Sequence, residues 1–296
     1  MAASKNPMEI RAQISILQTY DIETGKIEVL KRFDHVIEAP NWTKDGKKLV
    51  YNGDGHIYFF DLETKESELI DTGIADSCNN DHVLSPDGSG VAVSSGRGEP
   101  GYASRIYTVN FGSGVAREIT PISPSYLHGW SPDGKTFAYC AMREKENGIE
   151  ADIYTCPVDG GEEVQLTFTH GLNDGPEYSP NGKHIWYNSV RSGLMQLWRM
   201  KADGSEQTQM TFDENANAWF AHVSPDGKTV VYIIYHKGDL EPGQHVPDKN
   251  VEIRSIPVEG GEEKTLISFF GGQGSINVNS WSPDSKKFAF VSYEKE

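Results

Sequence analysis

Histidines recur close to a repeated turn and are the first residues in this sequence that could carry chemistry. His82 and His128 each stand three residues before the first residue of such a turn, and His222 stands two residues before another. Imidazole and carboxylate groups hold a divalent metal when they converge to roughly 2.0–2.6 Å from it. One interpretation is a metal in a central channel bound by these three histidines, and the alternative is that they line a water-filled channel. Carboxylates that would complete a metal site lie in the same segments: Asp81, Asp174 and Glu177.

A second group of residues could bind an anion. Cationic side chains stand at similar offsets in four consecutive units of the chain, at Arg97, Arg143, Arg191 and His236. A guanidinium group holds a carboxylate or phosphate through two parallel hydrogen bonds, so these positions suit a small anionic ligand. The alternative is that they pair with acidic residues of neighbouring units. The residues that we assign to ligand binding are His82, His128, Arg97, Arg143, Asp174, Glu177, Arg191, Trp219, His222, His236 and Asn279. The same polar segments contain Asn79, Tyr126, Gln273 and Asn277.

The sequence holds no recognisable catalytic motif. Asp174 and Glu177 are a carboxylate pair of the kind that glycosidases use, but two carboxylates three residues apart are common by chance. No Gly-x-Ser-x-Gly segment is present, so no hydrolase nucleophile can be assigned. These observations favour a protein that binds without catalysis, and we assign no catalytic residue.

One tetrapeptide organises the whole chain of 296 residues. Ser-Pro-Asp-Gly or a close variant begins at residues 43, 85, 131, 179, 224 and 282. Serine and aspartate accept local backbone hydrogen bonds, proline presets φ, and glycine permits a positive φ, so the tetrapeptide predicts a tight turn. We expect the carboxylates of these turns to be structural.

Short apolar or alternating runs surround each turn and predict β-strands. Four short antiparallel strands in each unit of about 40–45 residues are typical of a β-propeller blade. We therefore predict an all-β, six-bladed propeller that forms a single domain. Five blades are expected at about 36–71, 79–120, 126–168, 175–212 and 218–268.

The sixth blade is expected to be composite, built from residues 11–32 and 272–296. The C-terminal part of the chain supplies only two of the four strands of this blade. We therefore expect strands within about 13–30 to pair with those within about 276–293. Closure of the ring removes unpaired sheet edges, which otherwise promote aggregation. The polar segments between blades then gather at one mouth of the channel, away from the Ser-Pro-Asp-Gly turns. The longest insertion, residues 237–250 with His245, should rim the same mouth and could act as a lid.

The Trp-Ser-Pro-Asp-Gly-Lys turn at 130–135 and the Val-Asp-Gly-Gly turn at 158–161 resemble the propeller repeats of the TolB family. Related repeats occur in prolyl-oligopeptidase-like peptidases and in oligogalacturonate lyases. The TolB resemblance implies a non-catalytic scaffold that binds a protein, a peptide or a small ligand at the funnel. The lyase resemblance implies the alternative of a metal-dependent enzyme on an acidic glycan, with a His-lined funnel. TolB itself has an additional α/β domain and an export signal, and neither is expected here.

Charge and composition restrict the partners. The net charge of −16 repels phosphate, so nucleic acid and anionic membranes are poor partners. No apolar run approaches the roughly 20 residues of a membrane helix. Three widely spaced cysteines predict a reducing compartment rather than a disulfide framework. We expect a cytoplasmic monomer, with a periplasmic location as the alternative if a signal peptide has been removed.

Overall fold

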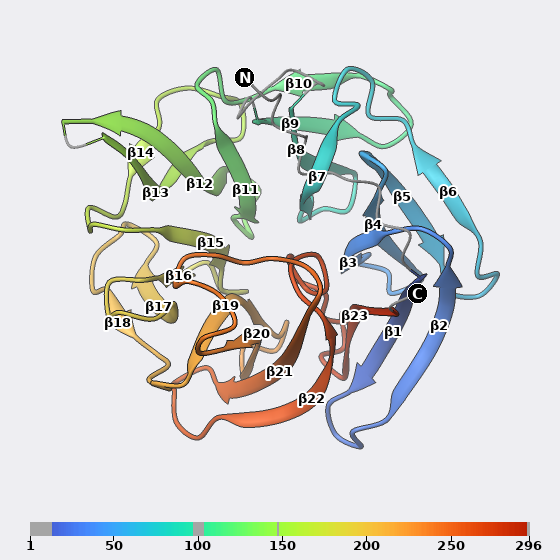
Figure 1. The fold of residues 1–296 in the computed structure, drawn as a ribbon. Coiled ribbons are helices and arrows are strands. Elements are labelled where there is room, and N and C mark those ends of the chain that lie inside the picture. Colours follow the sequence, from blue (N-terminus) through green and yellow to red (C-terminus); the bar gives the residue numbers. More distant parts are fainter. Residues whose placement is uncertain (1–13, 97–103, 147, 295–296) are drawn as a thin grey trace, which may run out of the picture.

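Six β-sheets radiate from a central axis like the blades of a propeller (Figure 1). The computed structural model describes residues 14–96, 104–146 and 148–294. Each sheet is antiparallel and each blade is followed around the ring by the next blade in the sequence. The prediction of an all-β, six-bladed propeller is therefore confirmed.

Five blades are complete sheets of four strands, and their innermost strand comes first in the sequence. Blade 1 contains β3 (Ile37–Trp42), β4 (Lys48–Gly53), β5 (His56–Asp61) and β6 (Ser67–Ile70). Blade 2 contains β7 (Cys78–Leu84), β8 (Gly90–Ser95), β9 (Arg105–Asn110) and β10 (Ala116–Glu118). Blade 3 contains β11 (Ser125–Trp130), β12 (Thr136–Lys145), β13 (Gly148–Pro157) and β14 (Val164–Gln165). Blade 4 contains β15 (Asn173–Tyr178), β16 (His184–Ser189), β17 (Gln196–Lys201) and β18 (Thr208–Gln209). Blade 5 contains β19 (Ala216–Val223), β20 (Thr229–His236), β21 (Lys249–Pro257) and β22 (Lys264–Gly271).

Blade 6 is assembled from both ends of the chain. It contains β1 (Ile14–Asp21), β2 (Ile27–Phe33) and β23 (Lys287–Glu294), and β1 lies between the other two. The pairing of β1 with β23 runs without interruption from Ile14 opposite Glu294 to Asp21 opposite Lys287. The predicted composite blade is thus present, with the ring closed by strands from the two ends of the chain.

The innermost position of blade 6 differs from the expected regular strand. Residues 275–281 meet β23 through one isolated bridge, between Trp281 and Phe288, and through two backbone hydrogen bonds, from the Ala289 amide to Ser280 and from the Val291 amide to Ser275. Other polar groups of this segment bond across the channel: the Ile276 carbonyl accepts from His222, and the Asn277 side-chain amide donates to Asp81. These bonds tie blade 6 to blades 2 and 5.

The Ser-Pro-Asp-Gly turns are structural, as expected. In all six, the hydroxyl of the first residue donates to the third residue's side-chain oxygen at 2.6–2.9 Å. That same oxygen accepts a backbone N–H two residues later, at 2.9–3.1 Å. These bonds lower the pKa of the exposed Asp87 carboxyl to about 2. The carboxylates of the turns are therefore held in place locally rather than presented to a ligand.

A tyrosine hydroxyl fastens the outer strand of each complete blade. Its partner lies in or next to the fourth strand, at distances of 2.8–3.2 Å. The pairs are Tyr51 with Ser67, Tyr107 with Glu118, Tyr139 with Glu163, Tyr187 with Gln207 and Tyr232 with Glu263. This hydrogen bond anchors the short outer strand, which forms few ladder hydrogen bonds of its own.

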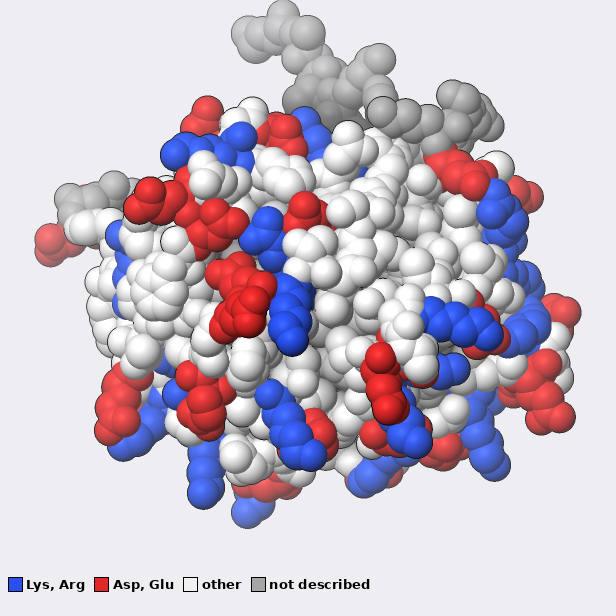
Figure 2. All heavy atoms as spheres, turned by 90° about the horizontal axis from the view of Figure 1, so that it is seen from below, with Lys and Arg blue, Asp and Glu red and all other residues white. Residues whose placement is uncertain are grey.

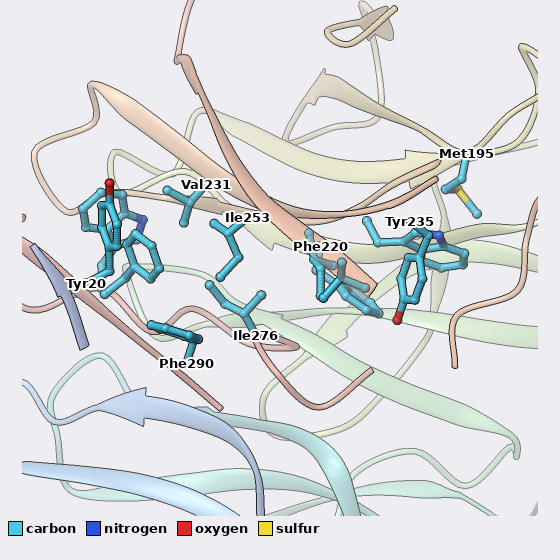
Figure 3. Close-up of a cluster of buried hydrophobic side chains, with 13 residues drawn as sticks. Tyr20, Met195, Phe220, Val231, Tyr235, Ile253, Ile276 and Phe290 are labelled. Carbon is cyan, nitrogen blue, oxygen red and sulfur yellow. The ribbon is translucent and has the colours of Figure 1, made fainter. Parts of the chain in front are cut away.

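Apolar side chains fill the spaces between blades rather than a single central core. One cluster runs from Tyr20 and Phe290 of blade 6 through Ile253 and Ile276 to Phe220 near the axis (Figure 3). Another joins Leu17 and Val291 of blade 6 to Leu49 of blade 1. Because each blade packs on its two neighbours, loss of one blade exposes the faces of two others.

The surface has charges of both signs. Lys and Arg alternate with Asp and Glu over the side of the molecule seen in Figure 2, so this side forms no patch of one sign. Cys78, Cys140 and Cys156 are buried and unpaired. Among the described residues, no helix has the length and apolar character needed to cross a bilayer.

The clasp between β1 and β23 makes a stability prediction. Leu17 is 0 % exposed and pairs with Val291, so Leu17→Ala should lower the free energy of unfolding by about 3 kcal/mol. Urea unfolding followed by circular dichroism measures this loss, and the ring should still unfold in one step. Val29→Ala in β2, where the side chain is 53 % exposed, is the matched control and should change stability by less than about 0.5 kcal/mol. Equal effects of the two substitutions would contradict the importance of the clasp.

Candidate functional site

Two cavities lie along the propeller axis and are lined by the innermost strands. The outer cavity measures about 270 Å³ and is bounded by β7, β11, β12, β15 and the segments around residues 243–245 and 273. The inner chamber measures about 130 Å³ and is bounded by β3, β7, β11, β15 and residues 278–279. His128 lines both and therefore stands between them.

A repeated irregularity aims the inner-strand side chains. Each of β3, β7, β11, β15 and β19 contains a break in register against its second strand. Ala39, Gly175 and Phe220 lie within these breaks at φ of 55–60°. At Gly175 a Cβ atom would lie 2.8 Å from the Asn188 side-chain oxygen, so glycine is required there. Such bulges redirect side chains out of the regular alternation, which explains how adjacent polar residues reach the channel.

The outer cavity is built around two buried carboxylates with an imidazole between them. His128 Nε2 lies 3.6 Å from Asp81 Oδ1 and 3.4 Å from Asp174 Oδ1. Both distances exceed the roughly 2.7–3.2 Å of a normal N–H···O hydrogen bond, so the three groups are in contact without a tight pairing. Asp81 also accepts hydrogen bonds from Asn277 at 2.7 Å and from Asn79 at 2.8 Å. These residues come from blades 2, 3, 4 and 6.

Burial sets the protonation of this group. It raises the pKa of Asp81 to about 7, although the amides of Asn277 and Asn79 oppose the shift. It also raises the pKa of Asp174, with His128 opposing, and lowers the pKa of His128, with Asp174 opposing. Burial thus disfavours the charged form of all three groups, and a charged ligand would act against this effect.

The long loop between β20 and β21 covers this cavity. The His245 ring lies 4.4 Å from the Trp219 ring and 5.3 Å from the Phe220 ring, centre to centre. Phe220 in turn stacks on His128 at 5.6 Å. Burial lowers the pKa of His245 to about 3, so the covering ring is neutral. The insertion therefore lies at the mouth where it was expected, and Gly243 and His245 are its residues that line the cavity.

Close contacts at the Val246 carbonyl hold the loop between β20 and β21 in place. The Val246 carbonyl accepts hydrogen bonds from the Tyr235 hydroxyl at 2.8 Å and from the Gln273 amide at 3.0 Å. Gly272 has a φ of +144°, and a Cβ there would lie 2.2 Å from the Val246 oxygen. Only a residue without a side chain permits this contact.

Glu177, His222 and Asn279 form a satisfied network below the outer cavity. Glu177 faces His222 Nδ1 at 2.6 Å and accepts hydrogen bonds from the Val223 amide at 2.9 Å and the Asn279 side chain at 2.7 Å. His222 Nε2 donates to the Ile276 carbonyl at 2.8 Å. These residues come together as predicted, but their polar atoms are used to join blades 4, 5 and 6.

Arg143 and Arg191 line neither axial cavity. Arg143 donates to both oxygens of Glu163, at 2.8 and 2.7 Å, and to the Pro124 carbonyl. Arg191 stacks at 3.9 Å on Trp198 and bonds to Tyr187 and Gln207. The expectation that these two grip an anion is wrong for the arrangement seen, because their own blades already occupy the guanidinium groups.

The remaining predicted site residues are dispersed. Arg97 lies outside the described residues. His236 lies at the end of β20, 3.6 Å from Glu252. Trp219 is fully buried and contacts the site through His245. Sequence reasoning missed Cys140, Met142, Leu172 and Gly243, which form the less polar wall of the outer cavity. Nothing in their local sequence distinguishes them from core residues.

The three histidines proposed as metal ligands do not fit a metal. Among the described residues, no group of three His, Cys, Asp or Glu side chains converges as a ligand set. Both ring nitrogens of His222 face protein partners, and His82 is fully buried in the inner chamber. The predicted set of His82, His128 and His222 is corrected accordingly.

The fold and the channel define a six-bladed β-propeller with a polar axial site. Residues 129–258 match the family model described as the TolB beta propeller domain. An Agrobacterium fabrum relative named "Uncharacterized protein Atu1656" is 43 % identical over 280 residues, which cover 94 % of this chain and 92 % of the relative. The chain belongs to the family of TolB-like β-propeller proteins.

Solved and curated proteins place it within that family. A solved candidate TolB from Agrobacterium tumefaciens is 41 % identical, with a TM-score of 0.89, covering 97 % of this chain and 100 % of that one. The Tol-Pal system protein TolB of Francisella tularensis is 26 % identical over 275 residues. The match covers 90 % of this chain but only 59 % of that protein.

The buried Asp81 predicts an unusual pH dependence. Because the folded state raises the Asp81 pKa to about 7, from about 3.9 in an unfolded chain, its proton stabilises the fold at low pH. That contribution is lost as pH rises from about 4 to about 7. Thermal unfolding should therefore show Asp81→Asn gaining stability relative to wild type over this range.

Asp87→Asn is the control of opposite sign. Its folded pKa of about 2 lies below the unfolded value, so its contribution is present above about pH 4 and lost as pH falls towards 2. A constant difference between Asp81→Asn and wild type from pH 4 to 8 would contradict the assigned burial.

Proposed function

We propose that this protein is a non-catalytic binding propeller whose outer cavity receives a cationic, hydrogen-bond-donating group of a peptide, a protein or a small ligand. The observation that carries the proposal is that the carboxylates of Asp81 and Asp174 both lie beside His128 inside a cavity of about 270 Å³. None of the described residues that line this cavity is Lys or Arg. Asp81 and Asp174 therefore have no Lys or Arg partner among the described residues that line the cavity, and the basic side chain beside them is His128.

An ammonium group suits these contacts. It is a compact charge with three donors, and two carboxylates can accept from it at once. Entry of a cation favours the ionised forms of Asp81 and Asp174, whose protonation burial otherwise favours. Met142 and Leu172 provide an apolar wall against which the stem of an amine can pack.

An acidic ligand finds less support in the arrangement. A uronate lyase would need a cation to hold the substrate carboxylate, and Arg143 and Arg191 are bound within their own blades. It would also need a metal-ligand set, which the described side chains do not form. The small anionic ligand and the acidic glycan are therefore the less favoured alternatives.

Short peptides that differ only at one amine test the proposal. A panel of peptides with free N-terminal amines, each matched to its acetylated form, is titrated by isothermal calorimetry. We expect binders among the free-amine peptides, with acetylation weakening binding about tenfold or more, since a hydrogen bond to a charged group contributes roughly 1.5–3 kcal/mol.

Asp174→Asn should reproduce the loss caused by acetylation. Asp203→Asn, in an exposed turn where Asp203 bonds only locally to Ser205, is the control and should bind as wild type does. Equal binding of acetylated and free peptides, or tighter binding of galacturonate oligomers, would refute the assignment.

A further inference from the structure

The inner chamber lies closer to the Ser-Pro-Asp-Gly turns than the outer cavity does. Its lining includes Trp130 and Tyr178, each directly before such a turn, and Val278 and Asn279 from the segment before the last turn. His128 separates it from the outer cavity. Its volume of about 130 Å³ equals about four water molecules at roughly 30 Å³ each.

Two side chains that line the chamber have polar atoms without partners. His82 is 0 % exposed, and neither ring nitrogen forms a hydrogen bond within the described part of the chain. The carbonyls of Ala39 and Val50 lie beside the ring without completing a bond of normal geometry. The indole N–H of Trp130 is likewise buried and unpaired among the described residues. Buried polar groups almost always have partners, so these atoms point to a guest.

The chamber offers no unbalanced charge to that guest. The Glu177 carboxylate already receives two donors and faces the imidazole of His222. Asn41 is also satisfied, because its amide donates to the Asn279 carbonyl and its oxygen accepts from the Leu84 amide. Burial lowers the pKa of His82 to about 4, so this imidazole is neutral and has one donor and one acceptor.

We propose that the inner chamber is a second binding site, distinct from the outer cavity, for a small neutral molecule bearing hydroxyl groups. A hydroxyl both accepts and donates, so a molecule with several hydroxyl groups can accept from the Trp130 indole and supply a partner to His82. An ammonium ion has no acceptor and would leave the indole N–H unpaired. An anion would lie beside the Glu177 carboxylate, whose hydrogen bonds are already made within the protein.

Ligand titration followed by NMR tests the proposal on the whole protein. The probes are glycerol and erythritol as neutral polyols, glycerate as the anion and ethanolamine as the cation. The indole N–H resonance of Trp130 is assigned by its absence in Trp130→Phe. We expect the two polyols to shift this resonance saturably, while glycerate and ethanolamine do not.

Trp130→Phe keeps the ring and removes only the donor. It should weaken polyol binding about fivefold, the effect of losing one hydrogen bond of about 1 kcal/mol. Trp42→Phe is the matched control, because Trp42 also precedes a turn and has an unpaired indole N–H but does not line the chamber. It should leave the affinity unchanged. Asp174→Asn should also leave it unchanged, which separates this site from the outer cavity.

Four results would overturn the proposal. One is the absence of any saturable shift of the Trp130 indole with either polyol, which would leave the chamber to water alone. Another is an equal loss of affinity in Trp130→Phe and Trp42→Phe. The third is tighter binding of glycerate than of glycerol. Binding that is lost in Asp174→Asn but kept in Trp130→Phe would place the polyol in the outer cavity and has the same consequence.

Discussion

Edge-to-edge pairing of β1 with β23 is the interaction on which the rest of the molecule depends. A blade can bury its two faces only if it has a neighbour on each side, and a row of six blades would leave two faces uncovered. The uninterrupted pairing from Ile14 opposite Glu294 to Asp21 opposite Lys287 completes the sixth blade and closes the row. Closure also fixes the width of the axial channel, because five innermost strands and the segment 275–281 must converge on it. The site is therefore a consequence of ring closure rather than of any one blade.

Because those strands converge, their polar side chains need hydrogen-bond networks near the axis. Polar side chains meet where little water is available, and isolated charges there would be costly. Glu177, His222 and Asn279 answer with short hydrogen bonds that reach across three blades. Residues 275–281, which form no regular strand, supply further bonds of this kind through the Ile276 carbonyl and the Asn277 side chain. Asp81 and Asp174 also accept short hydrogen bonds, but their contacts with His128 are longer than a hydrogen bond. This looser contact separates the group around His128 from the structural network.

The loop between β20 and β21 gives the two ends of the channel different characters. His245 rests on Trp219 and Phe220 at the outer mouth, and the contact of Gly272 with the Val246 carbonyl keeps the loop close. At the other end, the turns are fixed by their own serine and aspartate side chains. The outer cavity is thus bounded in part by a loop, whereas the inner chamber is lined by Trp130 and Tyr178, which directly precede such turns.

The repeated Ser-Pro-Asp-Gly turn and the spare strands at the ends of the chain were sufficient to predict the six blades and their closure. Turn chemistry is local, and Ser131 bonds to Asp133 whatever the rest of the chain does. The convergence of Asp81, His128 and Asp174 was only partly predictable, because bulges in the inner strands set where adjacent side chains point. The partner of Arg143 could not be predicted. Its offset along the chain matches that of a funnel residue, but Glu163 of the same blade lies near enough to accept from its Nε and from one of its terminal nitrogens. Sequence alone determined the repeat, because repetition needs only local bonds; the tertiary structure decided which charges remain free, because that depends on neighbours distant in the chain.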